Sequence, residues 1–379
     1  MPLEYKDDWE QAKRRMRAWW AHDNVGRCGL SVTAPRDGAA DVPPPPAAGR
    51  PEEKWYGLDY WSELTEWVNA RTFFGGEAFP MYQMGYAGVT THAAFLGCEV
   101  ELGPDTGWVR PHPDLAGEAL DASALRIDER RRGYRYAIDR LRRAARESGG
   151  KCIPGVGAFG GTGDTLAWLR GTERLLYDLA DRPEEVAAAE RHLIGQWCRL
   201  YDRFHEITRE AAEGSTCWFG LWSPGKFYAP QNDFSYMISP ETYERVFLPA
   251  LLEQLAFLDH AVYHVDGVGA FVHVDLLCEL PGLQGLQILP GEGRPGPLHY
   301  MPVLKKVQAA GKNLHIALRP EEISSALREL SARGLFISTA CRTEREARDL
   351  LRNAERWSTD RVIPAGRREC PPSRRPPRR

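Results

Sequence analysis

The sequence predicts an α/β protein of the (β/α)8 TIM-barrel class with a helical extension at its N-terminus. Short apolar runs alternate with helical stretches from residue 152 to residue 356, which is typical of parallel βα units. No linker interrupts this alternation. It therefore favours one barrel over a two-domain, doubly wound protein.

The elements follow from periodicity and from helix start signals. An amphipathic helix is predicted over residues 5–21, and a short strand at Gly29–Thr33. The later strands are predicted at Cys152–Ala158, Thr216–Leu221, Ala261–Val265, Leu283–Leu289, Asn313–Leu318 and Gly334–Ser338. Helices are predicted at 60–70, 133–147, 165–179, 184–212, 240–259, 269–279, 299–310, 320–332 and 342–356. Ser239, Pro240 and Glu241 form a typical helix start, with an N-cap, a first-turn proline and a first-turn acid.

The pattern predicts one domain over residues 1–360 and a basic tail over residues 361–379. The last part, 364–379, is rich in arginine and proline and contains no core residues, so we expect it to be disordered. Residues 37–53 are rich in proline, alanine and glycine and are predicted to form a loop.

Composition narrows the class of partner. The formal net charge of −3 gives no general attraction to nucleic acid or to an anionic membrane. No apolar run approaches the roughly 18 residues that a transmembrane helix needs. The N-terminus lacks the basic-then-apolar order of a signal peptide, which favours the cytoplasm. The eight cysteines are scattered without a CxxC pair, as expected for reduced thiols.

The segment from Ala261 to Gly269 carries the strongest chemical signal. Residues two apart on a strand point to the same face, so His264 and Asp266 should project together from a strand end. Gly267 and Gly269 let the chain turn sharply after them. An imidazole beside a carboxylate suits a metal, a proton transfer or a substrate amine. The alternative is a buried histidine that its neighbour satisfies.

In a parallel barrel the reactive groups come from the carboxyl ends of the strands and the loops that follow. One long loop of this kind contains Trp222, Tyr228, Asn232 and Asp233, a polar and apolar mixture suited to a small organic substrate. An ordinary surface loop is the alternative. Gln287 is a polar residue within an apolar strand and needs a buried partner.

Cys341 lies just beyond the last predicted strand and would face the same end of the barrel as His264. Thiolate and imidazole are preferred zinc ligands, and Asp266, Gln287 or Glu292 could complete the set. A free cysteine packed under a helix is the alternative. Another pattern, the glycines of Gly155–Gly160, matches GxGxxG. Pro154 breaks the strand that should precede it, so we interpret the segment as a loop at the barrel end.

Several stretches together resemble the uroporphyrinogen decarboxylase superfamily, which includes corrinoid-linked methyltransferases with a (β/α)8 barrel. They are Leu166–Val186, Asp233–Glu244, Phe247–Pro249, Tyr263–Gly267 and Ile337–Ala347. The resemblance covers most of residues 10–357. The arginine-containing N-terminal segment of true uroporphyrinogen decarboxylases is absent from the region of Arg27–Asp37. A porphyrinogen substrate is therefore not expected.

The zinc methyltransferases of this superfamily resemble the chain in a His-x-Cys motif at one strand end and a cysteine near the last strand. His264 and Cys341 match this pattern, while Asp266 stands where the first cysteine would be. The resemblance implies a zinc site formed by His264, Asp266 and Cys341. It also implies a small-molecule substrate and a corrinoid protein that carries the methyl group.

The leading hypothesis is metal-assisted methyl transfer to or from a corrinoid or a thiol. In it, Asp233, His264 and Asp266 carry the chemistry, and Trp222, Tyr228, Asn232 and Gln287 bind the substrate. A metal-free decarboxylase or lyase, with Asp233 or Asp266 as general acid, is the second hypothesis. A ligand-binding barrel without catalysis is the third, and a nicotinamide-dependent oxidoreductase is the fourth.

Overall fold

The computed structural model describes residues 2–39, 41–115, 117 and 120–363. The predicted disordered segment 364–379 lies outside these residues. The fold is mixed α/β, with a seven-stranded sheet in the order β2-β1-β11-β10-β9-β8-β7. Every neighbouring pair in this sheet is parallel except β1 and β2, which are antiparallel.

The strands of the main sheet are β1 (Gly29–Pro35), β2 (Thr72–Gly76), β7 (Phe227–Tyr228), β8 (His260–Asp266), β9 (Gly285–Leu289), β10 (Asn313–Ala317) and β11 (Leu335–Ala340). Two small antiparallel sheets pair β3 (Val100–Leu102) with β4 (Gly107–Val109) and β5 (Ser215–Thr216) with β6 (Trp222–Ser223). The sequence thus located β1 and β8 to β11 correctly. In these strands, β-branched and aliphatic residues form short buried runs.

The described residues do not form the closed eight-stranded barrel that the sequence predicts. The predicted strand Cys152–Ala158 makes an isolated bridge between Ile153 and Met81, and Val156 bonds to the carbonyl of Thr216. These few backbone bonds connect the segment to its neighbours without forming a continuous ladder. Pro80 and Pro154 have no backbone N–H to donate, which accounts for the interruption.

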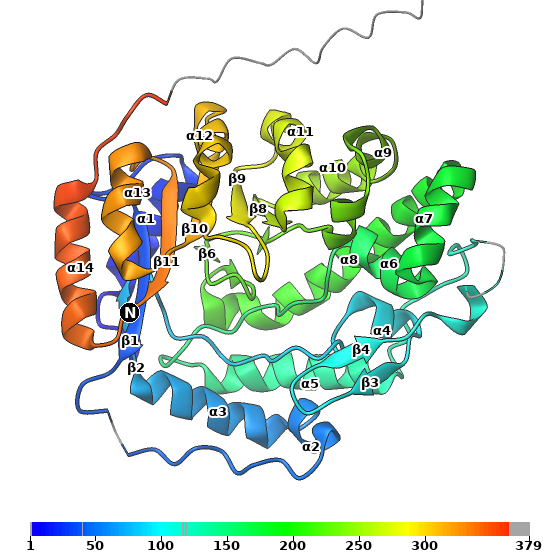
Figure 1. The fold of residues 1–379 in the computed structure, drawn as a ribbon. Coiled ribbons are helices and arrows are strands. Elements are labelled where there is room, and N and C mark those ends of the chain that lie inside the picture. Colours follow the sequence, from blue (N-terminus) through cyan, green and yellow to red (C-terminus); the bar gives the residue numbers. More distant parts are fainter. Residues whose placement is uncertain (1, 40, 116, 118–119, 364–379) are drawn as a thin grey trace, which may run out of the picture.

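The α-helices are α1 (Trp9–Trp20), α2 (Pro51–Trp55), α3 (Leu58–Arg71), α4 (His92–Leu96), α5 (Arg132–Glu147), α6 (Thr162–Arg170), α7 (Thr172–Asp181), α8 (Pro183–Ala212), α9 (Pro240–Val246), α10 (Leu248–Phe257), α11 (Val274–Glu279), α12 (Met301–Ala309), α13 (Ile323–Glu329) and α14 (Glu344–Trp357). The described residues also form the 3-10 helices η1 (Pro113–Leu115), η2 (Asp233–Met237), η3 (Val268–His273), η4 (Pro297–Tyr300) and η5 (Pro320–Glu322). Figure 1 shows α10 to α14 in an arc around strands β8 to β11.

Some predicted helices are divided in the structure. The stretch 165–179 is split into α6 and α7 at Gly171, which adopts a φ of 85°. The stretch 240–259 is split into α9 and α10 at Phe247, just before Pro249. The N-cap prediction is confirmed, because the Ser239 hydroxyl accepts the N–H of Thr242 at 3.2 Å.

Helix α1 confirms the N-terminal extension and covers the amino ends of the strands. The Trp19 indole donates to the carbonyl of Gly334, just before β11, at 3.0 Å. The side-chain amide of Asn313, at the start of β10, donates to the carbonyl of Trp19 at 2.7 Å. A site in this fold is therefore expected at the other edge, the carboxyl ends of β8 to β10, which we call the mouth.

The main hydrophobic core extends from Leu3 to Ala354 and lies between the sheet and its helices. The division into one domain and a tail stays a prediction. Within the described residues, no helix is both long enough and apolar enough to cross a bilayer.

Candidate active site around His264

His264 stands near the carboxyl end of β8 and is only 8% exposed. Its backbone N–H donates to the carbonyl of Pro230 at 2.8 Å, which ties β8 to the segment before η2. The imidazole Nδ1 lies 2.5 Å from Oε1 of Gln287. Asp266 lies on the same face of the strand, with Oδ2 3.9 Å from Nε2 of His264. The two-residue periodicity thus places these side chains as expected.

Asp233 joins this pair from η2. One ligand atom from each of Asp233, His264 and Asp266 can be chosen so that all three lie within 4.8 Å of one another. His264 Nδ1 is engaged by Gln287, so Nε2 is the nitrogen that faces the two carboxylates. An imidazole nitrogen and two carboxylates form a donor set that suits a divalent cation with open coordination positions.

A third carboxylate, Asp164 in α6, holds η2 in place. It accepts the backbone N–H of Asp233 at 2.7 Å and that of Phe234 at 3.2 Å. It also accepts the side-chain amide of Gln231 at 3.1 Å, and this amide reaches Asp233 as well, at 3.4 Å. Sequence reasoning missed Asp164. The available signal was a first-turn acid on the helix that follows the glycine-rich segment.

Burial and nearby charges change the ionisation of Asp233, Asp164 and His264. Desolvation by the surrounding protein, followed by the charges of Asp164 and Asp266, raises the pKa of Asp233 to about 8. Burial also raises the pKa of Asp164. Burial lowers the pKa of His264, opposed by its hydrogen bond to Gln287 and by the charge of Asp266. These shifts favour an uncharged imidazole at His264 and a protonated carboxyl group at Asp233.

Hydrogen bonds continue from His264 across the sheet. Gln287 on β9 is directly opposite His264 on β8 and His315 on β10. The Gln287 Nε2 lies 3.2 Å from Nδ1 of His315, whose Nε2 lies 2.9 Å from the hydroxyl of Ser338 on β11. Burial lowers the pKa of His315 to about 3, so this imidazole is uncharged. Gln287 thus has the buried partners that its place in the strand required.

Aromatic side chains flank the cluster at the mouth. The Trp218 ring meets the His264 ring edge-on at a centroid distance of 5.0 Å. The Tyr236 ring lies against Gly267 and Gly269, where an added Cβ would come within 2.8 Å of it. Gly267 adopts a φ of 81°, a conformation that glycine tolerates best. Trp218 and Tyr236 are both partly exposed, so they can meet a ligand.

Two of the predicted substrate-binding residues belong to the core instead. Trp222 is fully buried, and its indole donates to the carbonyl of Ala212 at 2.9 Å. Tyr228 is also fully buried, and its hydroxyl accepts the N–H of Phe159 at 3.0 Å. Both rings pack into the hydrophobic core, and their role in substrate binding stays a prediction.

Asn232 is 6% exposed, and both polar atoms of its carboxamide lack a hydrogen-bond partner within the described part of the chain. An added Cβ at Gly163 would lie 2.4–2.6 Å from this carboxamide, which places Asn232 against the first turn of α6. Asn232 therefore lies against α6 at the residue before Asp164, and its role in substrate binding stays a prediction.

Cys341 is not part of the cluster. It follows β11, which two intervening strands, β10 and β9, separate from β8. Its backbone N–H donates to the carbonyl of Thr33 at 2.8 Å. Burial raises the pKa of the Cys341 thiol to about 11. The structure therefore brings Asp233, not Cys341, to His264 and Asp266, because η2 folds back over the end of β8.

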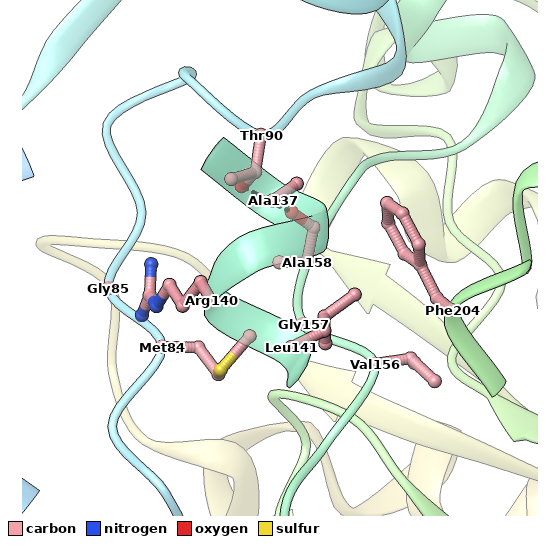
Figure 2. A pocket seen from close by; sticks show the side chains of 10 residues that line it. All are labelled: Met84, Gly85, Thr90, Ala137, Arg140, Leu141, Val156, Gly157, Ala158 and Phe204. Atoms are coloured by element: carbon pink, nitrogen blue, oxygen red, sulfur yellow. Dashed lines mark hydrogen bonds between the residues drawn. The ribbon is translucent and has the colours of Figure 1, made fainter. Parts of the chain in front are cut away.

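A small pocket elsewhere contains none of these groups. Figure 2 shows it between α5 and the segments around Gly85 and Gly157. Its lining is mostly apolar, and its one charged side chain, Arg140, donates to the carbonyl of Gln83 at 2.9 Å. We assign this pocket no chemistry.

Comparison with known proteins adds information about the fold. No protein-family model matches the sequence, and no curated protein matches it. Among the solved structures that match is a methyltransferase from Methanosarcina mazei, with a TM-score of 0.57 and 14% identity. The alignment covers 91% of this chain and 98% of that one. At this identity the likeness shows a shared fold, and the resemblance to the uroporphyrinogen decarboxylase superfamily stays a prediction.

Proposed function

We propose that this chain is a methyltransferase for a small molecule and that it works with a divalent metal ion at the mouth. The observation that carries the proposal is the group formed by Asp233, His264 and Asp266, whose ligand atoms lie within 4.8 Å of one another. The similarity of fold to a methyltransferase supports the reaction class.

The residues fit a metal ion on structural grounds. The Nε2 of a nine-tenths buried imidazole lies beside carboxylates, and a cation there would stabilise the ionised form of Asp233, which burial first and the charges of Asp164 and Asp266 second disfavour. No cysteine belongs to the group, so its donors are harder than those of a thiolate-rich zinc site. Zinc remains our proposed metal because it accepts imidazole and carboxylate ligands readily.

The metal would lower the pKa of an acceptor thiol, so that a thiolate nucleophile exists at neutral pH. His264 would present the Nε2 lone pair, and Asp233 and Asp266 would supply anionic oxygens. The Asp164 carboxylate would keep Asp233 in place by accepting the backbone N–H of Asp233. Trp218 and Tyr236 would flank the substrate and exclude water from the reacting atoms.

A corrinoid carried by a partner protein is our proposed methyl donor or acceptor. In the forward direction, the thiolate sulfur attacks the methyl carbon of methylcobalamin, and the new S–CH3 bond forms as the Co–CH3 bond breaks. Cobalt keeps the electron pair and leaves as cob(I)alamin. The sulfur enters as a thiolate, so no proton is transferred in this step.

The test is a spectroscopic assay with methylcobalamin, a panel of small thiols and the zinc-loaded full chain. Conversion to cob(I)alamin is expected with wild type and with the distant control Asp275→Asn. It is expected to disappear in His264→Ala and Asp266→Ala. Absence of conversion with every thiol and in the reverse direction would reject the proposal.

The protonated Asp233 favours a second candidate, a metal-free decarboxylase or lyase. A carboxyl group with its pKa near 8 can donate a proton to a developing carbanion at neutral pH. Decarboxylation of small carboxylated substrates that persists with a chelator, and that Asp233→Asn abolishes, would favour this reaction over methyl transfer.

A further inference from the structure

A chain of hydrogen bonds crosses four strands and ends on Nδ1 of His264, the ring nitrogen on the side of Gln287 rather than Asp266. His264, Gln287, His315 and Ser338 lie on β8, β9, β10 and β11 respectively. The successive distances are 2.5, 3.2 and 2.9 Å. We call these four side chains the relay.

The relay has two self-consistent directions. An uncharged imidazole carries a proton on one nitrogen and a lone pair on the other. Each histidine therefore donates one hydrogen bond and accepts the other, so the donor-to-acceptor direction is the same along the whole relay. If the Gln287 oxygen faces His264, then His264 carries its proton on Nδ1, and its Nε2 lone pair faces Asp233 and Asp266. If the Gln287 amide turns over, His264 Nδ1 becomes an acceptor, and Nε2 carries the proton.

The structure places Oε1 of Gln287 at His264 and Nε2 of Gln287 at His315. His315 Nδ1 must then accept a hydrogen bond, and its Nε2–H must donate to the Ser338 hydroxyl. His315 is almost completely buried, and within the described part of the chain its ring hydrogen-bonds to these two side chains. In the orientation that the structure shows, the acceptor nitrogen of His315 holds the Gln287 side-chain N–H, so the amide oxygen stays directed at His264.

We infer that His315 is a positioning residue that acts through Gln287 to hold His264 in the Nδ1–H tautomer, with the Nε2 lone pair directed into the site. This inference deepens the proposed function, because only that tautomer can bind a metal through Nε2. His315 itself lies behind Gln287 and does not belong to the metal-binding group.

The decisive experiment reads the tautomer in the metal-free full chain, at a pH where His264 is uncharged. Nitrogen NMR of 15N-histidine-labelled protein distinguishes Nδ1–H from Nε2–H imidazole, and a His264→Gln sample assigns the signal. We expect Nδ1–H in wild type and a mixture or Nε2–H in His315→Leu. An Nε2–H wild type, or a folded His315→Leu with an unchanged signal, would overturn the inference.

A suppressor variant separates positioning from a purely structural role. In Gln287→Glu both side-chain oxygens are acceptors, so the carboxylate holds Nδ1–H of His264 whatever stands at residue 315. The double variant Gln287→Glu/His315→Leu should therefore regain the wild-type tautomer. Failure of this rescue in a protein that remains folded would point to general disruption and count against the inference.

Metal affinity provides a second measurement. Zinc titration should give about a tenfold weaker Kd for His315→Leu and a recovery in the double variant, as is typical when a group behind a metal ligand is removed. If His315→Leu does not fold, the milder Ser338→Ala removes the last acceptor of the relay and should shift the tautomer in the same direction. Because the NMR signal needs no turnover, a failed methyl-transfer assay would leave this test intact.

Discussion

The backbone N–H of Asp233 donates to the carboxylate of Asp164 at 2.7 Å. Asp164 thus holds the backbone of Asp233 in place. This bond joins the first turn of α6 to η2, although the two residues are far apart in the chain. Its consequence is both geometric and electrostatic. Asp164 holds Asp233 near His264 and at the same time opposes its ionisation.

Replacing Asp164 by asparagine should therefore lower the pKa of Asp233. The variant removes a neighbouring negative charge, while its amide oxygen can still accept one N–H from η2. Carbon NMR of labelled aspartate, with and without the substitution, measures this change. The matched control is Asp275→Asn, because the native Asp275 forms an ion pair with Lys306 on the surface, outside the site. An unchanged Asp233 titration in Asp164→Asn would contradict the electrostatic coupling.

Stability should fall as the pH rises through the range in which Asp233 ionises. Its pKa is about 8 in the folded protein against 3.8 for an ordinary aspartate. The group therefore stabilises the fold fully below pH 4 and loses this contribution as the pH rises towards 8. Although the surrounding protein desolvates the carboxyl group of Asp233, part of the residue is open to solvent, and solvent screening reduces the size of the effect.

Urea unfolding of the metal-free protein at several pH values checks this expectation. The difference between wild type and Asp233→Asn isolates the contribution of this group from all other titrations. The free energy of unfolding of wild type should fall relative to that of the variant between about pH 4 and pH 8. A difference that stays constant with pH, or that grows in the opposite sense, would contradict it.

Metal titration should separate the observed cluster from the ligand set that the sequence predicted. His264→Ala and Asp266→Ala should weaken zinc binding on the order of a hundredfold or more, because each removes a ligand. Cys341→Ala should leave the affinity unchanged, since its thiol is outside the cluster. Equal losses in Cys341→Ala and His264→Ala would restore the predicted set and disprove the geometry described here.

Zinc affinity should also rise between pH 6 and pH 8 in wild type. Asp233 must lose its proton before it can bind the cation, so binding should release protons in this range. Calorimetry in buffers of different ionisation enthalpy measures the number released. Asp233→Asn should bind zinc more weakly and with less proton release; equal release in both proteins would show that Asp233 is not a ligand.

The two buried aromatic residues should affect stability more than function. Trp222→Ala should cost about 3–5 kcal/mol of unfolding free energy, as expected for a large buried ring. Tyr228→Phe should cost about 1–3 kcal/mol, because the N–H of Phe159 loses its buried acceptor. Urea unfolding measures both values. If Tyr228→Phe changes the KM for the substrate but leaves the stability unchanged, Tyr228 binds the substrate after all.

The sequence by itself determined the local elements and two of the three residues of the site, His264 and Asp266. Apolar runs fixed β8 to β11, the proline after Ser239 fixed the start of α9, and strand periodicity placed His264 and Asp266 on one face. These features depend on residues that are neighbours in the chain. Their local conformations are set by propensity and by the period of the strand or helix.

Only the tertiary structure decided which distant groups meet. Asp164 reaches the site because α6 packs beside η2, and Cys341 misses it because two strands stand between β11 and β8. Trp222 and Tyr228 look like site residues in a loop but turn into the core. Such contacts depend on packing between elements far apart in sequence, for which the chain carries no periodic signal. The same is true of the bonds from Gln287 to His315, which the strand register alone brings together.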